Sequence, residues 1–270
     1  MAIIAMSREL GSLGTVIGTQ AAKRLNYDYV YQEITSTAAR DYEVMEEKLI
    51  RVVEKPPRFL EKLSGDFRRY QTFVQAQVFK IAEKNNVVLI GRWSTLLLRG
   101  IDHALRVRVT APLEVRARRV EKMMQVGGER ALELVKQNDL ERGERMRQLY
   151  DIDWTAPHLY DLVLNTEKIS VEAGTTLIVE LIQNQEFRTT KASEKKIHNL
   201  AVASAIRAEL KAHRSTRDVD VDIQVRDGHV ILMGVVASEA EKRAAERVVG
   251  AMKGTERVDS HLRVMAHAGR

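Results

Sequence analysis

The sequence predicts an α/β protein, with a mostly parallel sheet flanked by helices, followed by a small α-β-β-α-β unit. Three observations predict this class. Short apolar runs alternate with helical patterns over residues 1–186, as in sheets whose parallel strands are linked by helices. The first apolar run, 2–6, leads directly into a turn of small residues. After a polar stretch at 187–196, read as a linker, the periodicity changes over residues 197–267.

Composition limits the class of protein further. A chain of 270 residues is typical of two domains or one large one, and 44% hydrophobic with 30% charged residues is ordinary for a globular protein. No apolar run approaches the roughly 20 residues that cross a bilayer, and no signal peptide is recognised. The absence of cysteine excludes disulfides and thiolate metal sites, and we expect a cytoplasmic protein. A net charge of +6 does not by itself predict nucleic-acid binding, and it suits anionic small molecules or lipid surfaces.

The opening residues predict a strand, a turn and a helix. The turn contains Gly11, Ser12, Gly14 and Thr15, and apolar residues then recur at helical spacing up to Leu25. A tight turn at a helix N-terminus directs backbone N–H groups at one point and can hold a phosphate. The full P-loop pattern needs a Lys followed by Ser or Thr, and the first 22 residues contain no Lys. On local sequence alone, a phosphate-binding turn and an ordinary strand–helix turn remain equally open.

The other elements of the first unit follow in order. We expect strands at 27–34, 87–90, 105–109 and 161–166, and helices at 41–50, 67–84, 94–99, 113–126, 129–150 and 171–183. Ligands of such sheets bind beyond the carboxyl ends of the strands. Those ends carry the turn at 7–15, Gln32-Glu33, Gly91-Arg92 and the segment 110–112.

Arginines near these strand ends are candidate phosphate ligands. Arg92 follows a buried strand directly, which favours a ligand role over a surface one. Arg116 and Arg119 lie on a basic helix, for which a solvated face is an equal alternative. Asp139 and Arg142 have an i,i+3 spacing that also fits a simple ion pair. No zinc motif and no G-x-S-x-G hydrolase motif occurs, so no metal site and no hydrolase elbow is predicted.

The second unit is predicted from strict alternation and turn residues. A helix at 197–213 precedes two alternating runs, 219–225 and 230–236, which are joined through Asp227-Gly228, a favoured hairpin pair. Ser238 and Glu241 have capping-box spacing and begin a helix that runs to Lys253. A last strand is expected at 257–264.

Five segments of the first unit occur in a recognisable order. They are Ile4–Gly14 (with Ser7-Arg8-Glu9), Val88–Arg92, Ala111–Arg116, Asp139–Arg142 and Tyr160–Thr166. On these segments, most of residues 1–185 resembles the cytidylate kinase-like family of P-loop nucleotide kinases. The resemblance implies a P-loop kinase-like sheet and phosphorylation of a nucleoside monophosphate, specifically a pyrimidine one, with ATP and Mg²⁺.

The resemblance also implies roles for single residues, because phosphoryl transfer depends on positive charge and in-line positioning. The turn would hold donor phosphates, the Ser12 or Thr15 hydroxyl would reach Mg²⁺, and Arg92 would contact the acceptor. The implied nucleotide-binding residues are Arg8, Gly11, Ser12, Gly14, Thr15, Arg92 and Asp139. The implied catalytic residues, which would act on the transferring phosphoryl group, are Arg116, Arg119 and Arg142.

The chain departs from the family pattern at three places. Leu13 stands where the family usually has Gly, Thr15 where it usually has Arg, and Gln32 where an acidic residue is expected. A side chain at Leu13 would crowd a backbone that must approach phosphate closely. Two hypotheses therefore stay open: an active kinase, and a pseudokinase that senses a nucleotide, or acts as a scaffold, and signals through the second unit.

The second unit resembles the BON family over residues 197–265. The resemblance rests on the run Val221–Val236, with Gly228 and Gly234, and on the spacing from Gly254 to Val258 and Val264. It implies binding at a phospholipid or other hydrophobic surface, or to a protein partner. A third hypothesis makes this unit the operative part, binding anionic lipid or self-associating. Nucleic acid is not expected as a partner, and a homo-oligomer is left open.

Overall fold

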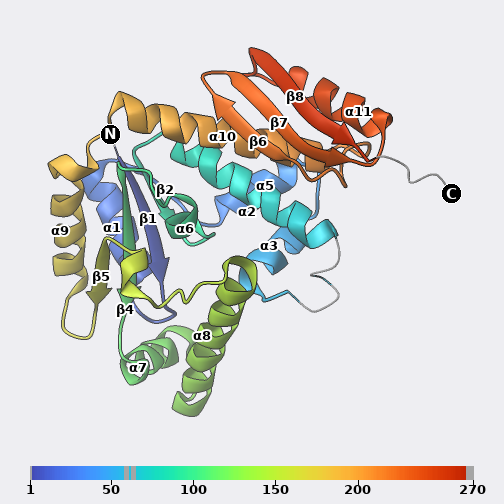
Figure 1. Ribbon diagram of the computed structural model, residues 1–270. Helices are drawn as coiled ribbons and strands as arrows, with labels where there is room; N and C mark the ends of the chain where they lie inside the picture. The colour runs from blue at the N-terminus through green and yellow to red at the C-terminus, as the bar shows by residue number, and fades with distance from the viewer. Residues whose placement is uncertain (1, 58–60, 62–64, 266–270) are drawn as a thin grey trace.

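A computed structural model describes residues 2–57, 61 and 65–265. The first sheet contains β1 (Ile3–Arg8), β2 (Asp28–Val30), β3 (Val87–Ile90), β4 (Ala104–Thr110) and β5 (Leu162–Asn165). Its helices are α1 (Gly14–Leu25), α2 (Glu33–Asp41), α3 (Glu46–Glu54), α5 (Gly65–Ala82), α6 (Ser94–Leu97), α7 (Leu113–Met124), α8 (Gly128–Tyr150) and α9 (Val171–Ile182). Figure 1 shows α7 and α8 beyond the carboxyl ends of the strands.

The first sheet is parallel throughout and has the strand order β2-β3-β1-β4-β5. The chain therefore leaves the central strand β1 toward β2 and β3 on one side and toward β4 and β5 on the other. A ligand crevice forms where the direction of winding changes, at the carboxyl edge. The predicted fold class, a P-loop kinase-like parallel sheet flanked by helices, is confirmed.

Both faces of this sheet are buried, which explains the continuous apolar strands. Alternate residues of β1 point to opposite faces: Ile3 belongs to the core under α2, α3 and α5, and Ile4 to the core under α1 and α9. Figure 1 shows α1 and α9 together on one side of the sheet. Helix α1 leaves the sheet immediately after the turn, so the turn lies at the crevice.

Two predicted elements of the first unit have other bounds. The strand expected at 27–34 ends at Val30, and the helix expected at 41–50 is replaced by α2 and α3. The backbone N–H of Tyr31 donates to the carboxylate of Glu33 at 2.9 Å, so the chain turns into α2 at this point. Glu43 has a φ of 51°, which separates the two helices. Apolar periodicity alone does not reveal either break.

The second unit has the predicted α-β-β-α-β order. It consists of α10 (Lys191–Ala212), β6 (Asp222–Arg226), β7 (His229–Val236), α11 (Glu239–Gly250) and β8 (Arg257–Val264). The sheet order is β6-β7-β8, with an antiparallel hairpin and a parallel last strand. Asp227 and Gly228 have φ values of 52° and 74°, as a tight hairpin turn of this type requires. The Ser238 hydroxyl accepts from the backbone N–H of Glu241, as the cap predicts.

The stretch expected to be a linker, 187–196, is helical from Lys191 onward. A capping box between Thr190 and Ser193 starts α10 there. Helix α10 has two apolar faces: Ile197 and Ala201 belong to the core of the first unit, whereas Ile206 and Leu210 belong to the core of the second. The helix packs along α5, so both units share it (Figure 1). Across the described residues, no helix is long and apolar enough to span a bilayer.

Candidate active site

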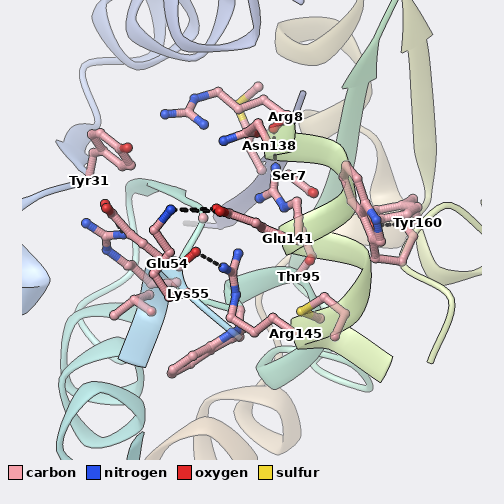
Figure 2. A pocket seen from close by; sticks show the side chains of 18 residues that line it. Ser7, Arg8, Tyr31, Glu54, Lys55, Thr95, Asn138, Glu141, Arg145 and Tyr160 are labelled. Atoms are coloured by element: carbon pink, nitrogen blue, oxygen red, sulfur yellow. Dashed lines mark hydrogen bonds and ion pairs between the residues drawn. The ribbon is translucent and has the colours of Figure 1, made fainter. Parts of the chain in front are cut away.

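A cavity of about 260 Å³ lies at the carboxyl ends of β1, β2 and β3 (Figure 2). Residues 6–8, Tyr31 and residues 91–93 line it from the sheet side, and the end of α3 with one face of α8 lines it from the other. The cavity therefore occupies the crevice in which ligands of parallel α/β sheets bind.

Cations dominate the lining of this cavity. They are Arg8, Lys55, Arg92, Arg142 and Arg145, and the carboxylates that face them are Glu54 and Glu141. Lys55 is paired with Glu141 at 2.8 Å, which leaves four guanidinium groups and one carboxylate. Such a cavity favours a small, multiply charged anion.

Burial and mutual repulsion act on two of these arginines. Burial, with the charges of Arg8 and Arg145, lowers the pKa of Arg142 to about 10. Burial likewise lowers the pKa of Arg145 to about 10, although the carboxylates of Glu54 and Glu141 oppose this. Both side chains stay charged at neutral pH, at a cost that a bound anion would offset.

Arg92 is held in an unusual backbone conformation. Gly91, Arg92 and Trp93 have consecutive φ values of 71°, 52° and 61°, and non-glycine residues with positive φ cost free energy. The Arg92 side chain is 6% exposed, and its Nη1 lies 3.6 Å from a carboxylate oxygen of Glu54, beyond hydrogen-bond distance. Its buried Nε has no hydrogen-bond partner among the described residues. The turn thus directs a cation with one unpaired N–H donor at the cavity.

Arg8 joins the cavity to the predicted phosphate turn. Its Nε donates to the Thr15 hydroxyl at 2.5 Å, and its guanidinium lies 4.8 Å from the centre of the Tyr31 ring. The side chain comes from the end of β1, just before the turn. A guanidinium group therefore contacts the turn, although no Lys occurs in it.

Helix α8 covers the cavity through two arginines. Arg142 donates to the backbone carbonyl of Arg8, and its guanidinium lies 4.6 Å from the centre of the Trp154 ring. Arg145 donates to the carbonyl of Glu54, and its buried Nε has no partner in the described part of the chain. Trp154 is buried, and the guanidinium of Arg108 also lies over its ring.

The glycines of the predicted turn are required by packing. A Cβ at Gly11 would approach the carbonyl oxygen of Arg116 to 2.6 Å, and one at Gly14 would approach the Cβ of Arg8 to 2.7 Å. Leu13 is the residue with the strained backbone, with a φ of 64° at the N-cap of α1. The resemblance correctly identifies Leu13 as the position that suits Gly. The turn lies beside the cavity and does not line it.

The turn keeps free donors. Within residues 2–57, 61 and 65–265, no acceptor is bonded to the backbone N–H groups of Leu13, Gly14, Thr15 or Val16. The buried Ser12 hydroxyl also has no partner there. Unpaired N–H groups at a helix N-terminus form an anion site.

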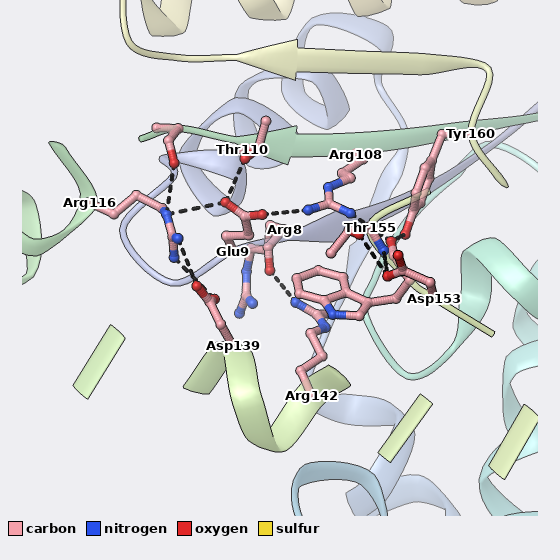
Figure 3. A network of polar contacts seen from close by, with 12 residues as sticks. Arg8, Glu9, Arg108, Thr110, Arg116, Asp139, Arg142, Asp153, Thr155 and Tyr160 are labelled. Atoms are coloured by element: carbon pink, nitrogen blue, oxygen red, sulfur yellow. Dashed lines mark hydrogen bonds and ion pairs between the residues drawn. The ribbon is translucent and has the colours of Figure 1, made fainter. Parts of the chain in front are cut away.

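Arg116 and Asp139, predicted to be functional, belong to a buried polar network beside the turn (Figure 3). Glu9 accepts from Arg108 at 2.5 Å and from the Thr110 hydroxyl at 2.6 Å. Arg116 lies 3.2 Å from Glu9 and is paired with Asp139 at 2.7 Å. The network ties the ends of β1 and β4 to α7 and α8, and neither Arg116 nor Asp139 lines the cavity.

Arg119 supports the turn from outside the cavity. It donates to the Gly11 carbonyl at 3.3 Å and to the Thr166 carbonyl at 2.7 Å. The Thr166 hydroxyl donates to the Ser12 carbonyl at 2.9 Å. Burial, with the nearby charge of Arg118, lowers the pKa of Arg119.

Three of the predicted residues, Arg8, Arg92 and Arg142, therefore line the cavity together. Gly11, Ser12, Gly14 and Thr15 form the neighbouring turn, and Arg116, Arg119 and Asp139 hold that turn and α8 in place. Arg145 also lines the cavity; the resemblance includes it in a cationic lid region from Arg116 to Arg145 but gives it no role of its own. Sequence reasoning missed Tyr31, Glu54 and Lys55, and of these only Tyr31 had a signal, its place at the end of a strand.

Comparisons with known proteins agree with this architecture. The cytidylate kinase-like family matches residues 3–168, and the BON domain matches residues 199–266. A cytidylate kinase of Methanocaldococcus jannaschii is 36% identical over 107 residues, 39% of this chain and 60% of that protein. One of Pyrococcus abyssi is 26% identical over 183 residues, 67% of this chain and 94% of that protein.

A solved structure, an uncharacterized protein from Eubacterium ventriosum, superposes with a TM-score of 0.55 at 19% identity. The superposition covers 68% of this chain and 100% of that one, and at this identity it is evidence only for a shared fold. For three of the cytidylate kinases, the match spans only 60%, 57% and 62% of their own length. The family model matches more than half of this chain. The chain therefore belongs to the cytidylate kinase-like family and carries a BON domain after that region.

Proposed function

We propose that the chain transfers a phosphoryl group from ATP to a nucleoside monophosphate, specifically a pyrimidine one, bound in the cationic cavity. The observation that carries the proposal is the set of four guanidinium groups around one carboxylate at the carboxyl ends of β1 and β3. A phosphate dianion would satisfy the unpaired Nε groups of Arg92 and Arg145. Family membership supports the same reaction class.

The roles of single residues follow from their positions. Arg92 and Arg145 bind the acceptor phosphate. Arg8 and Arg142, whose contacts join the cavity to the turn, stabilise the charge on the transferring group. An acceptor phosphate oxygen attacks the terminal phosphorus of ATP, and ADP leaves. The free N–H groups of residues 13–16 hold the donor phosphates.

The turn also suits Mg²⁺. Its buried Ser12 hydroxyl lacks a partner among the described residues, and the exposed Thr15 hydroxyl accepts from Arg8 Nε. Mg²⁺ takes few protein ligands beside phosphate oxygens, so one of these hydroxyls would hold it. The ion would neutralise phosphate charge, while Arg8 and Arg142 position the reacting groups.

The test is ATP-dependent phosphorylation of CMP, dCMP and UMP by the full chain, followed by ³¹P NMR. We expect turnover of at least one acceptor and its loss in Arg92→Gln. The exposed Arg99→Gln is the matched control. Turnover at the background rate with all three acceptors contradicts the enzyme.

A second function is favoured by one observation at the turn. Leu13 has a strained backbone, and its side chain stands in the turn where the donor phosphates would bind. Arg116 and Arg119 are bonded to residues of the chain itself and so are not available to a transferring phosphoryl group. We propose as the alternative a pseudokinase that senses a nucleotide or acts as a scaffold through the BON domain. Thermal-shift titration with ATP, CTP and cyclic nucleotides separates the cases. A shift without turnover supports the sensor, and no shift with any of them supports the scaffold.

For the BON domain we propose binding at an anionic phospholipid surface. The outward side of β7 exposes Val235, and Met265 follows β8; they are 55% and 56% exposed. Arg263 of β8 is the strand partner of Val235. Co-sedimentation with phosphatidylserine vesicles, lost at high salt, is the expected result. The full chain is the right sample, because α10 belongs to both cores. The alternative is that the BON domain binds a protein partner or a second copy of this chain. We also propose that the protein is cytoplasmic.

A further inference from the structure

Tyr31 lies at the carboxyl end of β2 and contacts two arginines from different strands. The centre of its ring is 4.8 Å from the guanidinium of Arg8 and 5.1 Å from that of Arg92. Arg8 belongs to the end of β1, and Arg92 follows β3. Although β3 lies between β2 and β1 in the sheet, the ring at the end of β2 contacts cations from the ends of both other strands, and both cations line the cavity. Figure 2 shows Tyr31 across the cavity from Tyr160.

The position of the ring is itself fixed by local structure. Val30 pairs with Leu89 of β3, and the next residue, Tyr31, donates its N–H to Glu33 at 2.9 Å. Its ring is partly buried against the apolar core that contains Met6 and Ile90. The backbone turn and the packing together leave the ring facing the guanidinium groups.

An aromatic ring affects a cation differently from a carboxylate. A carboxylate pairs with the N–H donors and cancels the charge, as Asp139 does for Arg116. A ring attracts the cation through its face and occupies no N–H donor in the plane of the guanidinium. Arg92 fits this description, since its Nε has no partner among the described residues. The ring therefore orients cations while their charge and their donors stay available to a ligand.

We propose that Tyr31 is a positioning residue that holds Arg92 in the orientation that binds the acceptor phosphate and Arg8 in the orientation that faces the transferring group. This inference rests on the proposed function of the cavity. Arg8 also bonds to Thr15 of the turn, so the ring fixes the distance between the acceptor phosphate and the donor phosphates. The tyrosine hydroxyl has no part in this role.

The test compares Tyr31→Phe, which keeps the ring, with Tyr31→Leu, which removes it. CMP is titrated calorimetrically into the full chain of each variant. We expect Tyr31→Phe to bind within about twofold of wild type and Tyr31→Leu to bind about tenfold more weakly, the size of two cation–π contacts. Tyr31→Met is the second ring-less variant, should Tyr31→Leu fold poorly, and a retained thermal unfolding midpoint shows that the fold is kept.

A double-mutant cycle with Arg92→Gln separates positioning from direct contact or a general structural role. If Tyr31 acts through the arginines, Tyr31→Leu loses most of its effect in the Arg92→Gln background. The same loss in both backgrounds overturns the positioning role, because the ring then contacts the nucleotide itself. Equal losses in Tyr31→Phe and Tyr31→Leu overturn it as well. If wild type binds no CMP, the proposed function fails too, whereas wild-type binding that Tyr31→Leu leaves unchanged overturns this inference alone.

Discussion

Two arginines of the cavity, Arg92 and Arg145, differ in their contacts from two arginines beside the predicted phosphate turn, Arg116 and Arg119. In the cavity, Arg92 and Arg145 have buried Nε atoms without partners among the described residues. Beside the turn, Arg116 is paired with Glu9 and Asp139, and Arg119 donates to two backbone carbonyls. A buried guanidinium with an unpaired N–H group costs the folded state free energy that a bound anion would recover, whereas a fully paired one stabilises the fold. Proximity to a candidate site therefore does not distinguish the two kinds.

The largest expected effect concerns the turn side. Replacing Arg116 by Ala leaves the buried Glu9 and the Asp139 carboxylate short of a partner. Breaking a buried ion pair in this way costs about 3–5 kcal/mol of unfolding free energy. Urea unfolding measures the loss, and the exposed Arg118→Ala is the control, with an expected change within about 0.5 kcal/mol. An equally small change in Arg116→Ala would show that the network is not structural.

The second prediction concerns the cavity side. Arg92→Gln removes the charged partner that we propose for the acceptor phosphate, worth about 1.5–3 kcal/mol, or about 10- to 150-fold in the KM for CMP. Its unfolding free energy should be unchanged or higher, because the guanidinium has no full ion pair. The exposed Arg99→Gln should keep the wild-type KM. A variant with normal KM and reduced stability would place Arg92 with the structural arginines.

The third prediction tests the turn itself. Leu13→Gly removes the strain of a left-handed backbone at a residue with a side chain, which stabilises the fold by about 1–2 kcal/mol. It also makes the unfolded chain more flexible, which destabilises the fold by about 0.5–1 kcal/mol. We therefore expect a stability change within about 1 kcal/mol and a larger thermal shift with ATP. Leu13→Ala keeps the strain and removes most of the side chain. If neither variant improves ATP binding, Leu13 does not limit the donor site.

The smallest effect is a pH dependence at the contact between α3 and α8. Burial alone would raise the pKa of Glu141, but hydrogen bonds from Lys55 and Gln137 outweigh it and lower the pKa below 4.5. A carboxylate whose pKa is lowered by folding stabilises the folded state above pH 4.5. This stabilisation is lost as the pH falls through the pKa that the carboxylate has in the folded protein. Glu141→Gln should be less stable than wild type at pH 7, and the difference should shrink at pH 3.5. A constant difference in urea midpoint would contradict this linkage.

Much of the fold was predictable because its signals are local. The order strand, turn, helix around Gly11–Thr15 and the strand ending at Gly91-Arg92 are each contained in a few consecutive residues. The bounds of α2 and α3 were not predictable, since Glu33 bonds back to Tyr31 and Glu43 adopts positive φ. The linker prediction overlooked that Ile197 and Ala201 have a partner surface on the first unit.

The candidate site was predictable only in part. Arg92 follows its strand directly, so sequence position alone indicates the cavity. Arg116 has the same indication, yet its role depends on Glu9, which is 107 residues earlier and reaches it through the pairing of β1 with β4. Lys55 lines the cavity because the end of α3 meets side chains of α8, Glu141 and Arg145, and nothing in the local sequence signals these contacts. Long-range neighbours decide whether an arginine is satisfied.

The most direct test of the contrast between the two groups of arginines is one titration done on two variants. CMP is titrated calorimetrically, at low temperature where both variants are folded, into Arg92→Gln and Arg116→Gln. We expect Arg116→Gln to bind within about threefold of wild type, because Arg116 does not line the cavity, and Arg92→Gln to bind at least about tenfold more weakly. Equal losses in the two variants, or a greater loss in Arg116→Gln, would contradict the division between ligand-binding and structural arginines.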